Sequence, residues 1–431
     1  MKFKHYNQRQ TTLLPYSFDD FISEKHPVRV VDQVVESINI QPLLKAYSKE
    51  GNPAYHPKML LKVILYAYMT NTYSSRKIEL AVRENINFMW LSGMSYPDHN
   101  TINRFRSVRL KEALRSVFEE VVKLLAAEGL LSIEEVYTDG TKIEANANKY
   151  TFVWKKAIQT NKEKMKKALG EIWQYAQSVA KAEDNLPEPP DFTDINPKKV
   201  QDTVDTLNSV LAKKTDLDKK VKAKLRRITK EYPQKIAEYE VKEAILGSRN
   251  SYSKTDTDAT FMRMKEDHMQ NGQLKAGYNV QISTSNQFIV NYTIHPNPTD
   301  TTTLKEHLQQ HEASFGKTLK TITADAGYGS QENYELLETA QIEAYVKYGM
   351  FDKQQSENHN NKKPFSQEKL FYNPQQDCYI CPMGQKMEYI GDGKHKTSTG
   401  FEQTSKRYQA KNCSNCPLNG ACHKSKGNRI I

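Results

Sequence analysis

Two aspartates in the sequence are placed where carboxylates can carry out metal-assisted chemistry. Asp139 follows the strand-like segment IEEVYTD and precedes a glycine, and Asp325 follows LKTITAD and precedes the glycine-rich turn AGYGS. Polar side chains at the carboxyl ends of strands face the crevice in which α/β proteins bind ligands. Two carboxylates that meet there suit Mg²⁺ or Mn²⁺, which take oxygen ligands and retain water. A lone aspartate before glycine is more often an ordinary turn residue, so only the pair favours a site.

A second chemical group lies in the last part of the sequence, where all five cysteines cluster. Cys378 and Cys381 form one CxxC pair, and Cys413 and Cys416 form another. Two such pairs can supply four thiolates to a tetrahedral, structural Zn²⁺ site. The alternative is a set of reduced structural cysteines. Further candidates for the fourth ligand are Cys422 and His423.

The first 125 residues are predicted to be helical. Pro27 and Pro57 suit the first turn of a helix, and Ser74 and Asp98 suit N-caps, each before apolar residues at helical spacing. Helices joined by a short turn are the outline of a helix-turn-helix. The helix after Asp98 carries polar residues that suit base edges or phosphates, although a solvated surface face is an equal alternative. The candidate DNA-binding residues are Asn100, Asn103, Arg104 and Arg106.

The hydrophobic pattern predicts the strands and helices around the two aspartates. Residues 133–139 are predicted to form a strand, and alternating apolar residues predict a β-hairpin over 274–294. A helix near 301–313, the strand LKTITAD, a helix near 331–341 and the strand EAYVKY follow. The strand–helix–strand order predicts a parallel pair in an α/β sheet.

A long helical segment over roughly 150–247 separates these strands and is interrupted by NLPEPPDF. Apolar residues at three- and four-residue steps favour a helical hairpin or a short coiled coil. Between positions 213 and 230 the segment is densely basic. Such a face is either solvated or lies along phosphates, and solvation is the more frequent case.

The overall composition limits the class of protein. The 431 residues carry 62 Lys and Arg against 51 Asp and Glu, a formal charge of +11, which favours a polyanionic partner over a merely basic protein. The longest apolar run, over 63–69, is too short to span a bilayer, and the polar start MKFKHYNQRQ holds no signal peptide. We therefore expect a soluble, cytoplasmic protein without a membrane partner.

Several strings resemble those of insertion-sequence DDE transposases. TDGTKIEANANKY around Asp139 is similar to the first catalytic segment of that family, and TADAGYGSQENY around Asp325 is similar to the second. LKAGYNVQIS resembles paired strands of the family's ribonuclease H-like core, and CSNCPLNGAC resembles its cysteine-rich segment. AYHPKMLLKVILYAYMTNTYSSRKIE and WLSGMSYPDHNTINRFR resemble its helical N-terminal domain.

The resemblance implies Mg²⁺-dependent cleavage at the ends of a mobile element and joining of the 3′ hydroxyl to target DNA. Asp139 and Asp325 then become metal-binding carboxylates in a two-metal site. The implied partner is double-stranded DNA, both the terminal repeats of the element and the target. Because two DNA ends must be paired, a homodimer on DNA is expected.

The expected fold is α/β, with a ribonuclease H-like mixed sheet, an all-helical N-terminal domain, a helical insertion and a small cysteine-rich, zinc-ribbon-like segment. The DNA-binding domain is expected over 1–125 and the two parts of the core over 126–149 and 251–350. The basic insertion is expected over 150–250, and the polar loop with the cysteine-rich zinc segment over 351–431.

The family also has a catalytic glutamate on a helix after the sheet, and no such motif is found in this sequence. Glu343 falls at the last strand, and Glu402 falls among the cysteines. The chain therefore resembles a C-terminally truncated transposase that binds DNA and cuts it poorly or not at all. In one alternative Glu332 or Glu335 supplies the third carboxylate. In others the chain is a DNA-binding protein only, or a stand-alone nuclease on the same core.

Overall fold

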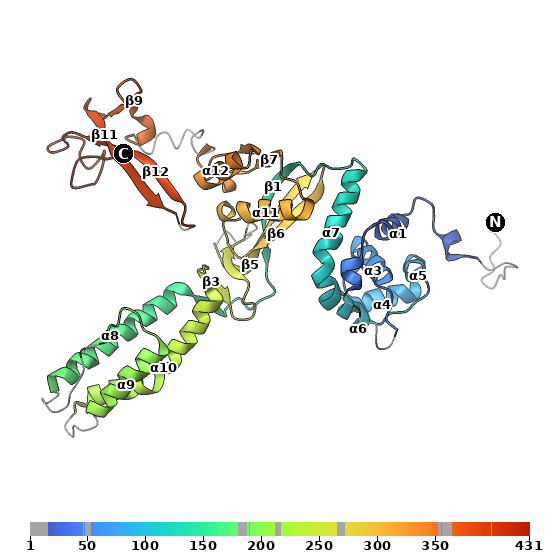
Figure 1. Ribbon diagram of the computed structural model, residues 1–431, viewed down its shortest axis with the longest axis horizontal. Helices are drawn as coiled ribbons and strands as arrows, with labels where there is room; N and C mark the ends of the chain where they lie inside the picture. Colours follow the sequence, from blue (N-terminus) through green and yellow to red (C-terminus); the bar gives the residue numbers. More distant parts are fainter. Residues whose placement is uncertain are drawn as a thin grey trace, which may run out of the picture. The chain divides into compact units, whose positions relative to one another are not determined.

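The chain of the computed structural model divides into two compact units. Figure 1 labels their helices and strands. The first unit comprises residues 1–133, 285–290 and 313–317, and the second comprises 134–284, 291–312 and 318–431. The structure describes residues 16–45, 47, 53–179, 188, 190–211, 217–264, 272–351, 355, 364–397 and 399–431. Each unit has apolar cores of its own and is described separately.

The first unit is helical, as predicted for this part of the chain. A π-helical turn (Phe105–Arg109) joins its last two helices, and a 3₁₀ turn (Phe18–Phe21) precedes the first. The helices are α1 (Pro27–Ser37), α2 (Gln41–Leu44), α3 (Pro57–Met69), α4 (Ser75–Glu84), α5 (Ile86–Ser92), α6 (His99–Arg104) and α7 (Leu110–Ala127).

The local signals for these helices are mostly confirmed. Pro27 and Pro57 stand at the first helical positions of α1 and α3. The side chain of Asp98 caps α6, because its Oδ1 atom accepts a hydrogen bond of 2.7 Å from the N–H of Thr101. Ser74 is the N-cap residue of α4, but its side chain makes no capping hydrogen bond. Apolar residues of α1 to α7 share one continuous core.

The second unit is built around a six-stranded mixed sheet. Its strands lie in the order β4–β5–β1–β7–β8, and β6 pairs with β5. β1 is antiparallel to β5 and parallel to β7, and β7 is parallel to β8. The strands are β1 (Glu135–Glu144), β4 (Thr260–Arg263), β5 (Leu274–Ser285), β6 (Phe288–His295), β7 (Thr321–Ala324) and β8 (Glu343–Val346).

Two sequence predictions about this sheet are confirmed. β5 and β6 form the expected hairpin, and Asn286 and Gln287 have the positive φ angles, 49° and 70°, of a tight two-residue turn. β7 and β8 form the expected parallel pair, with α12 (Gln331–Thr339) between them in sequence. The helix expected near 301–313 is α11 (Leu304–Phe315), after a 3₁₀ turn (Asp300–Thr302).

The strand predicted over 133–139 was too short. β1 pairs with β5 as far as Glu144, so Asp139 lies inside a strand and its glycine neighbour is not part of a turn. Only the parallel pairing of β1 with β7 stops at Thr138, because β7 itself ends at Ala324. The strand end inferred from the sequence is therefore the point at which β1 stops pairing with β7, and not the end of β1 itself.

One face of the sheet is covered by a hydrogen-bonded layer of polar side chains. Thr138 Oγ1 lies 2.8 Å from Ser283 Oγ, which lies 2.7 Å from His307 Nε2 on α11. The other ring nitrogen of His307 lies 2.7 Å from Thr293 Oγ1, which lies 2.7 Å from His295 Nε2. All five side chains are buried, so their hydrogen bonds replace those that water would make.

The insertion predicted as a helical hairpin contains three helices. α8 (Lys155–Val179), α9 (Pro197–Leu211) and α10 (Lys219–Leu246) share an apolar core that includes Leu207, Leu211, Ile228 and Ile236. A short antiparallel pair, β2 (Phe152–Trp154) and β3 (Ser251–Ser253), closes its base. The helical segment is therefore interrupted twice, once between α8 and α9, where the Pro-rich sequence lies, and once between α9 and α10. Parts of the predicted Pro-rich and basic segments, 180–187, 189 and 212–216, lie outside the described residues.

The cysteine-rich segment forms a four-stranded antiparallel sheet of its own. A small core beneath it contains Met387, Tyr408 and Ala410, and Arg429–Ile431 return to pair with β12. Part of the predicted polar loop before it, 352–354 and 356–363, lies outside the described residues. The strands are β9 (Phe371–Asn373), β10 (Cys378–Ile380), β11 (Lys386–Lys396) and β12 (Glu402–Ala410).

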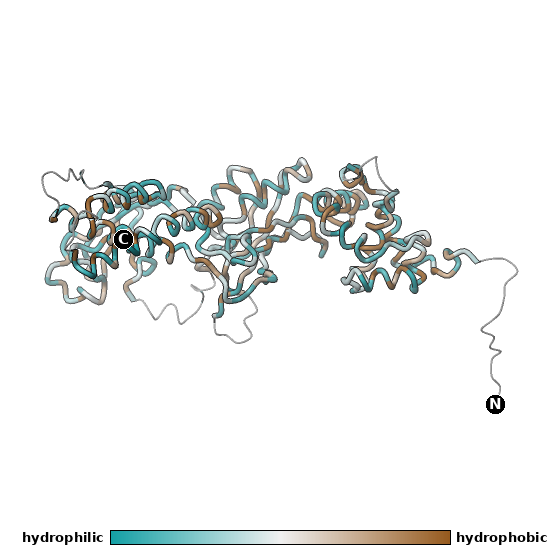
Figure 2. Tube along the Cα trace, turned by 90° about the horizontal axis from the view of Figure 1, so that it is seen from below, coloured by the Kyte–Doolittle hydropathy of each residue, from teal (hydrophilic) through white to brown (hydrophobic). Residues whose placement is uncertain are grey.

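Among the described helices, none combines the length and the apolar character needed to cross a membrane. Figure 2 shows why, since apolar residues (brown) occur in short stretches that hydrophilic residues (teal) interrupt. This distribution is that of helices with one covered face and one solvated face.

The buried polar layer predicts that acid weakens the second unit. Burial holds the pKa of His295 below its usual value of 6.5, although the carboxylates of Glu306 and Asp300 act in the opposite direction. Below about pH 6.5 the unfolded chain binds a proton that the folded chain does not, so stability falls as the pH falls. Protonation of His295 alone can lower the free energy of unfolding by at most about 1.4 kcal/mol per pH unit.

Urea unfolding of the wild-type chain between pH 7.5 and 5.5 measures this slope. We expect His295→Gln to flatten it, and His395→Gln, at an exposed position on β11, to leave it unchanged. A His295→Gln variant with the wild-type slope would contradict the assignment.

Candidate active site

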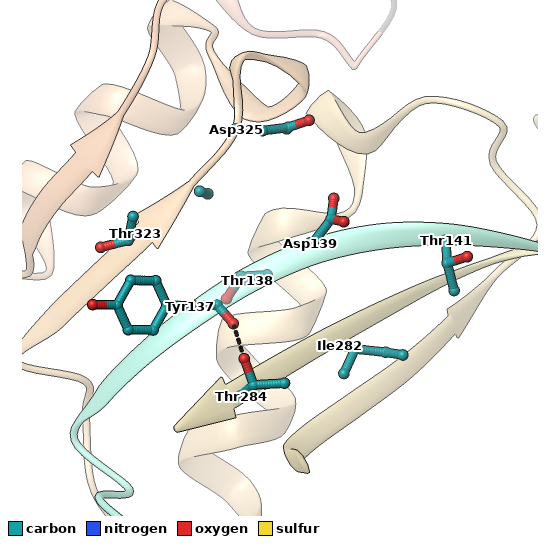
Figure 3. A pocket seen from close by; sticks show the side chains of 9 residues that line it. Tyr137, Thr138, Asp139, Thr141, Ile282, Thr284, Thr323 and Asp325 are labelled. Carbon is teal, nitrogen blue, oxygen red and sulfur yellow. Dashed lines mark hydrogen bonds between the residues drawn. The ribbon is translucent and has the colours of Figure 1, made fainter. Parts of the chain in front are cut away.

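Asp139 and Asp325 come together through strand register. The parallel ladder of β1 and β7 pairs Tyr137 with Thr323 and Thr138 with Ala324. Each aspartate is the next residue after the last pair, so two carboxylates separated by 186 positions in sequence reach the same end of neighbouring strands (Figure 3). The structure therefore brings together the two residues that the sequence predicted as a pair.

The two aspartates lie on the side of the sheet opposite the buried polar layer. Because side chains alternate along a strand, Tyr137 and Asp139 share this face, and Tyr137 is 65% exposed. The face forms the wall of an open cavity of about 390 Å³ (Figure 3). It is lined by Tyr137, Thr138, Asp139, Thr141, Ile282, Thr284, Thr323, Ala324 and Asp325.

One oxygen of each carboxylate is held by the backbone of a nearby glycine. Asp139 Oδ1 accepts a hydrogen bond of 2.8 Å from the N–H of Gly140. Asp325 Oδ1 accepts one of 2.9 Å from the N–H of Gly327, in the 3₁₀ turn (Ala326–Tyr328) that Asp325 caps. Both carboxylates are therefore oriented by the chain itself.

The donors at this cavity fit a hard divalent cation. Two carboxylates with room for water match the preference of Mg²⁺, which keeps several waters beside one or two carboxylates. Within the ranges that the structure describes, no three His, Cys, Asp or Glu side chains are grouped so as to hold a metal ion. Glu332 and Glu335, on α12, are not among the residues that line the cavity, and Glu335 accepts a hydrogen bond from Gln331.

The sequence matches two protein-family models. Residues 16–108 match a transposase domain (DUF772), and residues 249–411 match a transposase DDE domain. Together these matches cover more than half of the chain. The chain belongs to the insertion-sequence DDE transposases. No curated protein and no solved structure matches it.

The fold of the transposase agrees with this membership. A mixed sheet preceded by a helical region fits the ribonuclease H-like core of a DDE transposase. Asp325 lies inside the DDE match, whereas Asp139 lies between the two matches. The link between the two aspartates therefore depends on the β1–β7 register rather than on the family match alone.

The four residues predicted to bind DNA all lie in or just after α6 of the transposase, inside the first match. Asn100, Asn103 and Arg104 are exposed. Arg106 is half-buried, and its guanidinium donates to the carbonyl of Tyr73 at 2.8 Å and to Asn103 Oδ1 at 3.2 Å. Three of the four side chains are thus exposed to solvent, and the fourth, Arg106, is hydrogen-bonded within the helical unit.

The cysteines predicted as one set of four are not all placed alike. Cys378 is 3% exposed within β10 and is not among the residues that line the small cavity, about 20 Å³, beside this sheet. Arg429 donates a hydrogen bond of 2.8 Å to Cys422 Sγ, and the buried Nε2 atom of His423 finds no partner among the described residues. The potential ligands that line the cavity are Cys381, Cys413, Cys416, Cys422 and His423.

Sequence reasoning missed the polar side chains behind the aspartates. Asn279, Gln281 and Tyr328 are completely buried, and Tyr328 donates its hydroxyl hydrogen to Gln281 Oε1. Burial raises the pKa of the Tyr328 hydroxyl, and the nearby carboxylates raise it further, so Tyr328 stays a neutral donor. The signal was present in LKAGYNVQIS, where polar residues alternate with the apolar ones, but alternation alone does not say which face is covered.

Proposed function

We propose that this transposase cleaves DNA strands at the ends of its element and transfers them to target DNA, with Asp139 and Asp325 binding Mg²⁺ or Mn²⁺. The observation that supports this most directly is the β1–β7 register, which sets both aspartates one residue beyond the last parallel pair. Family membership supplies the substrate class, because transposases act on DNA. The formal charge of +11 agrees with a polyanionic substrate.

The residues of the chain prepare the site before any metal binds. The N–H groups of Gly140 and Gly327 orient the two carboxylates, so little rearrangement opposes cation binding. The hydroxyls of Thr141 and Thr323 line the same cavity and can donate hydrogen bonds to phosphate oxygens. When bound, the divalent ions would activate the attacking oxygen and stabilise the leaving oxygen of an in-line displacement.

The oligomeric state and the cellular location of the transposase follow from the proposed reaction. Strand transfer joins both ends of one element to the target DNA, so the two ends must be paired and two copies of the active site act together. We therefore propose a homodimer on DNA, with the terminal repeats and the target as double-stranded partners. The reaction is proposed to take place in the cytoplasm.

Cleavage of a duplex that carries the terminal sequence of the element, with Mn²⁺ or Mg²⁺, tests the catalytic assignment. We expect Asp139→Asn and Asp325→Asn each to lower the cleavage rate at least about 100-fold, because each removes a carboxylate that stabilises developing charge. Binding of the same duplex, measured by gel shift, should be unchanged in both variants. Glu312→Gln, at an exposed acid on α11 that does not line the cavity, is the matched control and should cut normally.

The binding-only alternative follows from the family's third catalytic carboxylate, a glutamate on a helix after the sheet, for which no motif is found in this sequence. It predicts a wild-type chain that shifts the duplex but leaves it intact with either metal. Cleavage that survives both aspartate substitutions would falsify the proposed site.

The helical unit is proposed to bind duplex DNA through α6. Arg104 is exposed there, whereas Arg106 supports the fold through Tyr73 and Asn103. We expect Arg104→Ala to weaken DNA binding and to reduce the salt slope of log K by about one, because one phosphate contact is lost.

Gel-shift titrations of the full chain at several salt concentrations provide the measurement. Arg407→Ala, at an exposed position of β12, is the matched control and should leave both affinity and slope unchanged. Arg106→Ala should lower the unfolding temperature of the helical unit instead. An Arg104→Ala variant with the wild-type slope would remove α6 from the proposed interface.

The cysteine-rich segment is proposed to bind one structural Zn²⁺. Four thiols and an imidazole line one small cavity, and the unpartnered Nε2 atom of His423 is chemically suited to a metal. The proposed thiolate ligands are Cys381, Cys413 and Cys416 from the two CxxC pairs, with Cys422 in place of Cys378. Their side chains must rotate inward to form a tetrahedral site.

Metal analysis of the purified chain should find one zinc per chain. We expect Cys422→Ser to lose zinc and Cys378→Ser to retain it, because Cys378 lies within β10 outside the cavity. Thiolates bind in the deprotonated form, so zinc release should be promoted by acid, and chelation should lower the unfolding temperature. Loss of zinc in Cys378→Ser alone would instead support the two CxxC pairs as the ligand set.

A further inference from the structure

A third carboxylate, that of Asp300, lies beneath the two aspartates of the proposed site. Asp300 begins the 3₁₀ turn between β6 and α11. Its Oδ1 atom accepts hydrogen bonds from Asn279 Nδ2 at 2.8 Å and from Gln281 Nε2 at 3.0 Å. Gln281 Nε2 also lies 3.0 Å from Asn279 Oδ1, so the two amides fix each other. The side chain of Asp300 is thereby directed toward β5.

The side chain of Asp300 does not act as a helix cap. The N-cap residue of this turn is Thr299, which makes no side-chain capping bond. The backbone carbonyl of Asp300, rather than its carboxylate, accepts the hydrogen bonds from the N–H and hydroxyl of Thr303. The carboxylate is therefore used for contacts outside its own turn.

Two of these contacts are with the glycines that follow the proposed metal-binding aspartates. A methyl group placed on Gly140 would lie 2.5 Å from Asp300 Oδ1, and one on Gly327 would lie 3.1 Å from Asp300 Oδ2. Both distances are shorter than ordinary contacts, so only glycine fits at position 140 without displacement of the carboxylate. Asp300 thus packs directly against the backbone of both glycines.

The same two glycines hold the proposed metal-binding carboxylates. The N–H of Gly140 donates to Asp139 Oδ1, and the N–H of Gly327 donates to Asp325 Oδ1. A displacement of either glycine must move the hydrogen-bond donor of the neighbouring aspartate. Asp300 is therefore linked to the Asp139 carboxylate through Gly140 and to the Asp325 carboxylate through Gly327.

Asp300 is itself held by a buried network. Asn279, Gln281 and Tyr328 are each 0% exposed, and the Tyr328 hydroxyl donates to Gln281 Oε1. With its Oε1 atom occupied in this way, the amide of Gln281 must present its NH₂ group to Asp300. Removal of the carboxylate would leave buried amide donors without an acceptor, at a cost of about 1–3 kcal/mol each.

We propose that Asp300 is a positioning residue of the cleavage site, which fixes Asp139 and Asp325 through Gly140 and Gly327. This inference rests on the proposed function, since it assigns a role relative to those two aspartates. Asp300 acts through the glycines and not as a metal ligand. Its contribution is the geometry of the site, which must be accurate to a fraction of an ångström for a two-carboxylate metal site.

Two substitutions separate geometry from charge. Asp300→Ala removes the hydrogen bonds and the packing against both glycines. Asp300→Asn keeps an oxygen acceptor of the same size for Asn279 and Gln281 but removes the negative charge. We expect Asp300→Ala to lower the maximal cleavage rate, at saturating metal and DNA, by ~10- to 100-fold, and Asp300→Asn to restore it to within about threefold of wild type.

Two further variants sharpen the comparison. Gly140→Ala should reproduce the loss of maximal rate, because its methyl group displaces the Asp300 carboxylate. Glu312→Ala, at an exposed acid on α11, is the matched control and should behave as wild type. Gel-shift affinity for DNA should be the same in all variants, so the change appears in the maximal rate and not in DNA binding. Thermal unfolding confirms that the rates are compared on folded protein.

Mn²⁺ affinity of the full chain, measured by electron paramagnetic resonance of the free ion, gives a readout that does not require cleavage. Asp139→Asn identifies the part of Mn²⁺ binding that belongs to the proposed site. Asp300→Ala should weaken this binding, and Asp300→Asn should largely restore it. A wild-type maximal rate in Asp300→Ala would overturn the proposal, as would equal losses in the Ala and Asn variants, which would assign a direct charge role. If the wild-type chain binds Mn²⁺ but does not cut DNA, the proposed function fails, and the Mn²⁺ series still decides the role of Asp300.

Discussion

The parallel pairing of β1 with β7 is the constraint on which the rest of the proposed site depends. Four paired positions, from Glu135 with Thr321 to Thr138 with Ala324, fix where Asp139 and Asp325 stand relative to each other. A shift of the register by one residue would turn one aspartate toward the buried layer, because side chains alternate between faces. β1 is held on its other side by eight paired positions with β5, which makes such a shift costly.

The two faces of this sheet serve different purposes. One face is open and carries the aspartates, threonines and Tyr137 around the cavity. The other is covered, and much of what covers it is polar, including His307 and Tyr328. Buried polar groups are tolerated only when they are hydrogen-bonded, and this requirement gives the covered layer fixed orientations that an apolar layer would lack. That rigidity lies directly behind the aspartates, where the proposed metal site would need it.

The other parts of the transposase keep their own cores. The three-helix insertion buries Trp173, Leu207 and Ile228 among themselves, and the cysteine-rich sheet packs around Met387 and Tyr408. Because its core is separate, each part can fold through contacts among its own residues. The insertion can therefore stand between Asp139 and Asp325 in the sequence without disturbing the strand register that unites them.

Local patterns in the sequence were enough to predict the individual helices and strands and the pair of aspartates. Pro27, Pro57 and Asp98 mark helix starts because a missing N–H or a capping carboxylate acts within the first turn of a helix, independently of the remaining chain. The β5–β6 hairpin and the parallel β7–β8 pair likewise follow from short-range patterns. The resemblance of the segments around Asp139 and Asp325 to the transposase family added their pairing.

Which polar residues are buried, and what they contact, follows from the folded arrangement of distant segments and could not be predicted from local patterns. Alternation along β5 identifies a strand, but the covered face includes Asn279 and Gln281, because Asp300 and Tyr328 supply their hydrogen-bond partners from elsewhere in the chain. The position of Cys422 beside the cavity, and of Cys378 away from it, likewise depends on how loops meet a sheet. Burial of a polar group is favourable only with its partner in place, and such partners are set by long-range packing that no local pattern records.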